Sequence, residues 1–182
     1  FRTPSSIFYL NSLFYLPYVK FFLVNSGAVF IMGFTNFVLL DKVYTLLKSQ
    51  KVTFILFLSI LSFIYINTAF YRFAEHGTDR SAMILIMILI IEILDLSNMK
   101  KSFNESNFLK LIVIITLVIS LKAFYVLYVI LLAPILLLFY QNKLSFIYFL
   151  KNMTLYICIL MICLVIITNF FNSGCLIYPL KF

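Results

Sequence analysis

The sequence predicts an all-α polytopic transmembrane helix bundle of about six spans, with a short interfacial helix at its N-terminus. Of the 182 residues, 64% are hydrophobic and 11% are charged, and the mean hydropathy is +1.12. Soluble domains have about 45–50% apolar and ~25% charged residues, so a soluble fold would leave much of this apolar surface in water. Segments 84–91 and 111–121 are apolar on every side and lack the alternation of a β-barrel strand. In a bilayer such segments satisfy their backbone groups as helices.

The N-terminal segment is too short to cross a bilayer. Residues 7–16 lie between Pro4 and Pro17, and a helix of that length spans ~15 Å of a ~30 Å hydrocarbon core. We therefore expect an interfacial helix with its tyrosines in the headgroup region. Six spans follow it, at 21–40, 52–71, 81–96, 108–121, 123–140 and 152–171.

Two of these predictions depend on single residues. The apolar run 108–140 would form one helix of ~50 Å, far longer than a tilted span, and Lys122 would lie near its middle. Because an unpaired charge is costly there, we place a turn at Lys122, and we expect Pro134 to kink the span that follows. In the first span, Gly27, Ala28 and Gly33 are expected to let another helix approach closely.

The distribution of basic residues predicts the topology. Loops 41–51, 97–110 and 141–151 carry eight lysines, against six basic residues on the other side. The positive-inside rule places these loops in the cytoplasm, and both ends and the 72–80 loop outside it. The net charge of +8 does not indicate nucleic-acid binding, because the basic residues are scattered without an aromatic-interleaved patch. The start at Phe1 and the abrupt end predict one transmembrane domain, 1–182, that is a fragment of a longer chain.

The 72–80 loop is the densest ionisable segment of the chain, with two arginines, two carboxylates and the sole histidine in nine residues. Arg72 and Arg80 suit a phosphate or pyrophosphate group, which they would hold by forked hydrogen bonds. Asp79 or Glu75 suits a general base or a ligand to a divalent metal, and His76 suits proton transfer near neutral pH. The loop is therefore the candidate site for an anionic ligand at the membrane surface.

Simpler structural roles also fit these residues. Thr78 or Asp79 makes a good N-cap for the third span, and the carboxylates of the loop could simply pair with its two arginines. Lys122 is a candidate phosphate contact or else a lysine that snorkels to the interface. Glu92 and Asp95 lie three residues apart on one helical face, where we expect them to mark the helix end rather than a proton path.

Three short patches resemble a known group of proteins. They are Glu-His-Gly-Thr-Asp-Arg-Ser-Ala at 75–82, similar to a "YGTD"-type motif that opens a span; Lys-Ala-Phe-Tyr at 122–125; and Ser-Gly-Cys-Leu-Ile-Tyr-Pro at 173–179. In this order they resemble uncharacterised bacterial polytopic membrane proteins of surface-polysaccharide gene clusters. That group is similar in turn to the type-C glycosyltransferases, which use polyprenyl-phosphate-linked sugars at the outer face of the membrane.

The resemblance implies a glycosyltransferase-like protein of the bacterial cytoplasmic (inner) membrane, acting in cell-envelope polysaccharide or glycolipid synthesis. Its partners would be membrane lipids and a polyprenyl-phosphate-linked sugar, with a divalent metal as the one cofactor to consider. The sequence departs from the pattern at His76, where the motif has an aromatic residue, and the early catalytic acid would precede Phe1. The alternative is a non-enzymatic transporter, flippase or polysaccharide-polymerase component.

Overall fold

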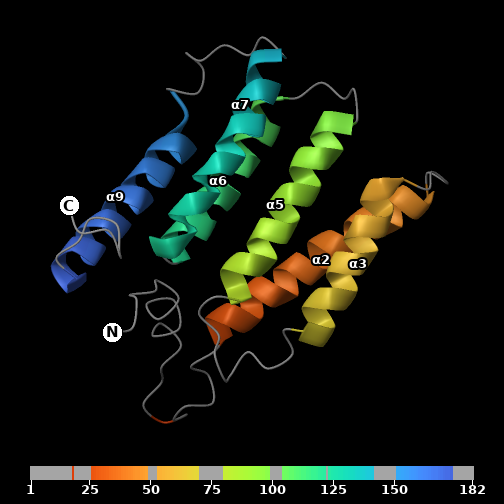
Figure 1. Cartoon of the computed structure of the whole chain (residues 1–182), viewed down its shortest axis with the longest axis horizontal. Helices are drawn as coiled ribbons and strands as arrows, with labels where there is room; N and C mark the ends of the chain where they lie inside the picture. Colours follow the sequence, from red (N-terminus) through yellow and green to blue (C-terminus); the bar gives the residue numbers. More distant parts are fainter. Residues whose placement is uncertain are drawn as a thin grey trace. The chain divides into compact units, whose positions relative to one another are not determined.

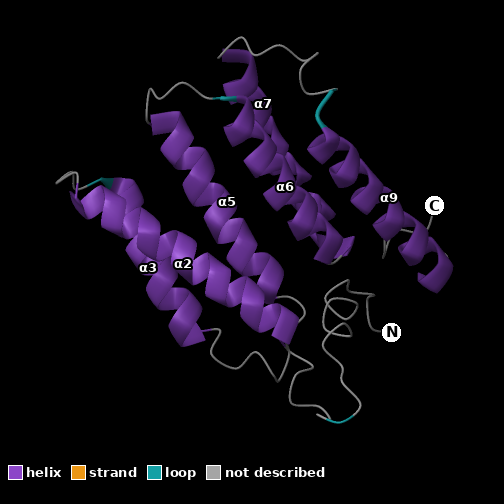
Figure 2. Cartoon of the chain, turned by 180° about the vertical axis from the view of Figure 1, so that it is seen from behind, coloured by secondary structure: helices purple, strands orange, loops and turns teal. Residues whose placement is uncertain are grey.

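The described part of the chain is almost entirely helical, as the sequence predicts. A computed structural model describes Tyr18 and residues 26–48, 53–69, 80–98, 104–121, 123–141 and 151–173. No strand occurs within these ranges (Figure 2). Its helices (Figure 1) are α2 (Ser26–Lys48), α3 (Phe54–Ala69), α5 (Arg80–Asn98), α6 (Glu105–Leu121), the 3₁₀ helix η1 (Ala123–Leu131), α7 (Leu132–Gln141) and α9 (Met153–Ser173).

The chain divides into two compact units. The described helices of the first unit, residues 7–95, are α2, α3 and most of α5, and those of the second, which includes residues 96–182, are α6, η1, α7 and α9. Within the first unit, successive helices run in opposite directions, as Figure 1 shows for α2, α3 and α5. Helices joined by short connections pack as antiparallel neighbours, and α2 and α3 are tightly packed in this way.

Polar side chains define the start of α3 and join it to α2. The hydroxyl Oγ1 of Thr53 accepts a hydrogen bond from the backbone N–H of Leu56 at 3.3 Å, which is the N-cap interaction that satisfies a free helix donor. Near the other end of α3, the side-chain amides of Asn36 and Asn67 exchange two hydrogen bonds, of 3.2 and 3.1 Å. These bonds connect α2 and α3.

The second unit contains a break between two helices at Lys122, where the sequence predicts a turn. α6 ends at Leu121, η1 begins at Ala123, and Lys122 itself lies outside the described residues. The helix changes from 3₁₀ to α at Leu132, so Pro134 lies in the first turn of α7. Proline is tolerated there because its missing N–H would have no intrahelical partner. α6 and α7 are in contact through Phe108 and Phe139, whose ring centroids are 5.1 Å apart.

Large apolar side chains are exposed along the described helices of both units. α2 exposes Phe30, Phe34 and Phe37, and α9 exposes Leu160 and many of its neighbours. A soluble surface rarely carries such continuous apolar area, whereas lipid solvates it. Among the described helices, two are both long and apolar enough to cross a membrane, namely Ser26–Lys48 and Met153–Phe171. The six-span arrangement therefore remains a prediction.

Small residues of α2 differ in what surrounds them. Gly27 and Ala28 are buried, in keeping with a close helix contact. Gly33 is not part of such a contact, because a Cβ atom added there would meet no other atom within 4 Å. The expectation of close packing at Gly33 is wrong for the described structure, since this side of α2 faces open space.

Candidate functional site

Most of the sequence-predicted site lies outside the described residues. This is true of Arg72, Glu75, His76, Asp79 and Lys122, so their proposed roles in catalysis, phosphate binding and metal binding remain predictions. The structure describes Arg80, which is the first residue of α5 and is partly buried. Of the candidate anion site, the structure therefore describes the point where its loop enters a helix.

The start of α5 concentrates groups that attract an anion. The first N–H groups of a helix have no intrahelical acceptor, and the helix dipole makes that end positive. α5 has no acidic residue in its first turn, so the guanidinium of Arg80 adds to this positive end. The neighbouring Ser81 is completely buried, and its hydroxyl has no hydrogen-bond partner among the described residues. Arg80 and the helix end suit a phosphate group, which accepts hydrogen bonds from backbone and guanidinium donors, whereas the Ser81 hydroxyl lies inside the packed part of the unit.

An apolar groove lies between α3 and α5 in the same unit. Its volume is about 310 Å³, and we call it the α3–α5 groove; it is lined by Leu58, Leu61, Ser62, Tyr65, Met87, Ile90 and Ile91. The spacing of these residues along each helix is the spacing of a single helical face. Arg80 precedes Met87 by seven residues, or two turns, and so lies on the groove-lining face of α5, ~10 Å nearer the helix start.

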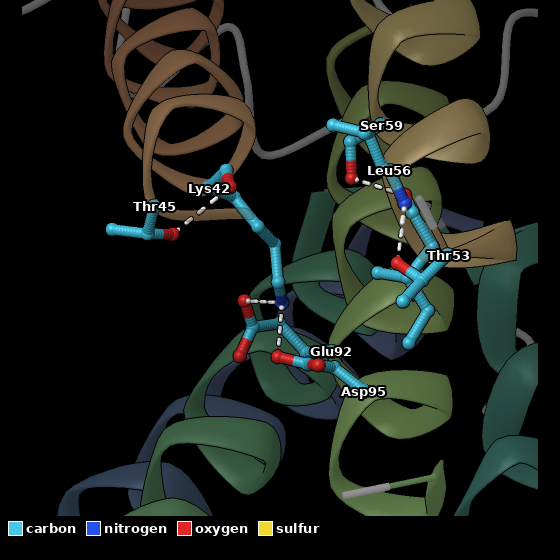
Figure 3. Close-up of polar contacts among 8 residues, drawn as sticks. Lys42, Thr45, Thr53, Leu56, Ser59, Glu92 and Asp95 are labelled. Atoms are coloured by element: carbon cyan, nitrogen blue, oxygen red, sulfur yellow. Dashed lines mark hydrogen bonds and ion pairs between the residues drawn. The ribbon is translucent and has the colours of Figure 1, made fainter. Parts of the chain in front are cut away.

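A second polar site joins α2 and α5 (Figure 3). The ammonium Nζ of Lys42 on α2 lies 2.7 Å from Glu92 Oε1 and 3.1 Å from Asp95 Oδ2, both on α5. The three side chains are mostly buried, with exposed fractions of 11% for Lys42, 12% for Glu92 and 21% for Asp95. The other carboxylate oxygen of Asp95, Oδ1, is buried without a hydrogen-bond partner among the described residues.

The Lys42–Glu92–Asp95 cluster lies on helical segments and not in loops. Lys42 lies within a helix long enough to cross a membrane, about 9 Å before that helix ends at Lys48. Glu92 and Asp95 lie ~18 and ~22 Å along α5 from its start. Charged groups inside such helices are costly unless paired. One lysine between two carboxylates leaves the cluster with a formal net charge of −1 when all three are ionised.

Comparison with protein-family models gives one match, which covers residues 3–182. The matching family is described as a domain of unknown function, DUF8201. The chain belongs to this family. Comparison with curated proteins and with solved structures yields no match. Membership extends over nearly the whole chain and both units, but it assigns no chemistry to any residue.

The cluster was not predicted from the sequence, because no local pattern pairs Lys42 with an acidic residue 50 positions away. Lys42 was expected in a loop, 41–51, whereas α2 continues to Lys48 and holds Lys42 on a helix. Glu92 and Asp95 were expected to mark a helix end, and they do lie in the last two turns of α5, which ends at Asn98. The available signal was the pair of acids within an apolar helix, which requires a cation from another segment.

The described residues show no group of three or more histidine, cysteine or acidic side chains that could hold a metal ion. The metal-binding hypothesis for Asp79 and Glu75 concerns residues outside this part of the chain. Cys158 is buried and Cys163 is exposed on α9 as free thiols, consistent with small side chains on an apolar helix.

Proposed function

We propose that this member of the DUF8201 family is an integral protein of the bacterial cytoplasmic membrane that uses polyprenyl-linked sugars. In this proposal it acts as a glycosyltransferase-like protein in cell-envelope polysaccharide or glycolipid synthesis. It crosses the membrane six times, and the 72–80 loop and both ends of the chain face away from the cytoplasm. The observation that carries the proposal is the start of α5, where Arg80 adds its positive charge to the end of a helix that has no acidic residue in its first turn.

The chemistry of these groups matches a lipid-linked phosphate. A guanidinium and a helix N-terminus bind a phosphate through charge-assisted hydrogen bonds, and the exposed apolar helix surfaces support a location in lipid. Arg72 and Lys122 would add charge to the phosphate site. Asp79 would bind a divalent metal or activate the acceptor, with Glu75 as a further metal ligand and His76 as a proton carrier.

Sugar transfer from a polyprenyl-phosphate-linked donor tests this function. The protein is reconstituted with its full natural chain, and transfer is compared among wild type, Asp79→Asn, Arg80→Ala and the matched control Lys48→Ala. Lys48 is an exposed basic residue at the opposite end of the first unit's helices. We expect a loss of at least about tenfold in transfer for the two site variants, equivalent to one lost charge-assisted contact, and little change for the control. Unchanged transfer in both site variants would remove this site assignment.

The Lys42–Glu92–Asp95 cluster favours a second candidate function, a non-enzymatic transporter, flippase or polysaccharide-polymerase component. Ionisable groups within spanning helices commonly mark substrate or ion pathways. In cells that depend on the protein, a triple variant Lys42→Met, Glu92→Gln, Asp95→Asn keeps the sizes of the side chains but removes their charges. Loss of polysaccharide export with intact sugar transfer would favour this candidate over the enzyme.

A further inference from the structure

A pair of amides lies at the surface of the first unit, near the middle of a helix long enough to cross a membrane. Asn36 is ~15 Å from the start of α2 and ~18 Å from its end, so in a bilayer its amide lies close to the midplane. It exchanges two hydrogen bonds with Asn67 on α3, and both bonds are exposed. Hydrocarbon holds no water that could satisfy polar groups at this depth. The amides therefore require their partners from protein.

The two amides do not use all of their hydrogen-bonding groups on each other. Each asparagine amide has two N–H donors and an oxygen with two acceptor positions. Asn67 donates to the oxygen of Asn36 and to the backbone carbonyl of Phe63, whereas Asn36 donates only to Asn67. Among the described residues, one N–H of Asn36 and one acceptor position on each amide oxygen are left without a partner. Because the pair offers both a donor and acceptors, it is complementary to an identical pair.

The surface of α2 beside Asn36 leaves room for a second helix. Gly33 precedes Asn36 by three residues and so lies on the same face, and a Cβ atom added to it would meet no other atom within 4 Å. Val29 and Leu40 continue this face in both directions and are 56% and 46% exposed. We call Val29, Gly33, Asn36 and Leu40 the α2 strip. Its spacings of four and three residues are those of the seam between two packed helices, in which one asparagine fixes the register and a glycine allows close approach.

We propose that the α2 strip is the contact between two copies of this chain in the membrane. Copies inserted in the same orientation are related by a two-fold axis along the membrane normal, so each residue near that axis meets its own counterpart at the same depth. The spare N–H of Asn36 would donate to an amide oxygen of the partner copy, and Gly33 would let the two α2 helices approach closely enough for this bond. A second copy thus supplies by symmetry the polar group that the midplane lacks. The proposal is independent of the glycosyltransferase function and requires only that α2 crosses the bilayer.

Disulfide crosslinking between single cysteines tests the contact in native membranes. All native cysteines of the full chain are replaced by serine. Leu40→Cys on the α2 strip is then compared with Phe34→Cys, which is also exposed but lies on another face of the same helix. A single cysteine forms no disulfide within one chain, so every disulfide-linked product joins two molecules. Oxidation should give a product of twice the chain's mass from Leu40→Cys and none from Phe34→Cys. Absence of the Leu40→Cys dimer, equal yields from both variants or a product of another mass would overturn the proposal.

Two substitutions on the α2 strip test its chemistry, with energy transfer between labelled copies in lipid vesicles as the measure of the dimer dissociation constant. Asn36→Leu should raise this constant about five- to thirtyfold, the effect of interhelical hydrogen bonds in model membrane helices. Gly33→Leu keeps the bonds to Asn67 and has room within its own chain, yet it fills the space that the partner copy needs, so it should weaken the dimer at least as much. Phe34→Leu, off the strip, is the control and should match wild type. A wild-type dissociation constant in either strip variant, or an equal loss in the control, would contradict the proposed contact.

Discussion

Replacement of Lys42 by methionine should destabilise the first unit more than any other single loss of a lysine from its described helices. Methionine keeps the length of the side chain but removes its charge. Glu92 and Asp95 would then be left as two carboxylates of like charge, three residues apart on α5 and both mostly buried. Removing one partner of a buried pair is costly because the remaining charge loses its compensation.

The distances set the scale of this effect. At 2.7 and 3.1 Å, the gross attraction of Lys42 to each carboxylate is about 5–6 kcal/mol at an effective dielectric constant of ~20. The desolvation of three charges offsets much of that attraction. A fully buried pair broken on one side costs about 3–5 kcal/mol and an exposed pair about 0–1 kcal/mol. Because the exposed fractions here are 11–21%, we expect a loss of about 2–4 kcal/mol.

Reversible unfolding in mixed micelles with increasing SDS fraction measures this difference. The control is Lys48→Met, which removes an exposed lysine from the last turn of the same helix and should change stability by less than about 0.5 kcal/mol. Adding Glu92→Gln and Asp95→Asn to Lys42→Met should recover part of the loss, because no uncompensated charge remains. If Lys42→Met and Lys48→Met were equally stable, the cluster would not bind α2 to α5 and the reasoning from burial would fail.

Three further predictions concern the other described contacts and the topology. Asn36→Leu and Asn67→Leu should each weaken α2–α3 packing, because the two amides donate hydrogen bonds to each other. In a double-mutant cycle the coupling free energy between them should be about 0.6 kcal/mol and at most ~1.7 kcal/mol. If the two losses of stability simply add, the two amides do not stabilise each other. Gly33→Ala should leave stability unchanged or raise it by up to about 1 kcal/mol, because the added methyl group meets open space and alanine favours the helix. A marked loss of stability in the same SDS titration would show that another segment packs against Gly33. In a variant without native cysteines, Ala69→Cys should react with an impermeant maleimide on intact cells and Leu47→Cys only after permeabilisation; the reverse pattern would invert the proposed topology.

The helical class was predictable because it depends on composition and on local sequence. Continuous apolar runs exclude alternating strands, and a proline, a cap or a charged connection indicates where a helix is interrupted. The breaks before α3 and after α6 follow such signals, at Thr53 and beside Lys122. The positive charge at the start of α5 was also accessible from sequence, because Arg80 ends the charged segment 72–80. That local information does not reveal which distant groups meet.

The amino-acid sequence alone determined that this chain is helical, that its surface is suited to lipid, and that its charge is concentrated before α5. Only the tertiary structure decided that Lys42 meets Glu92 and Asp95 across a separation of 50 residues or more, and that Leu61 and Ile90 line one groove. The physical reason is that an apolar helix carries no strong periodic signal for its partner face when lipid and protein are similarly apolar. Its packing is then selected by a few polar pairs and by close steric fit, which exist only between segments already brought together.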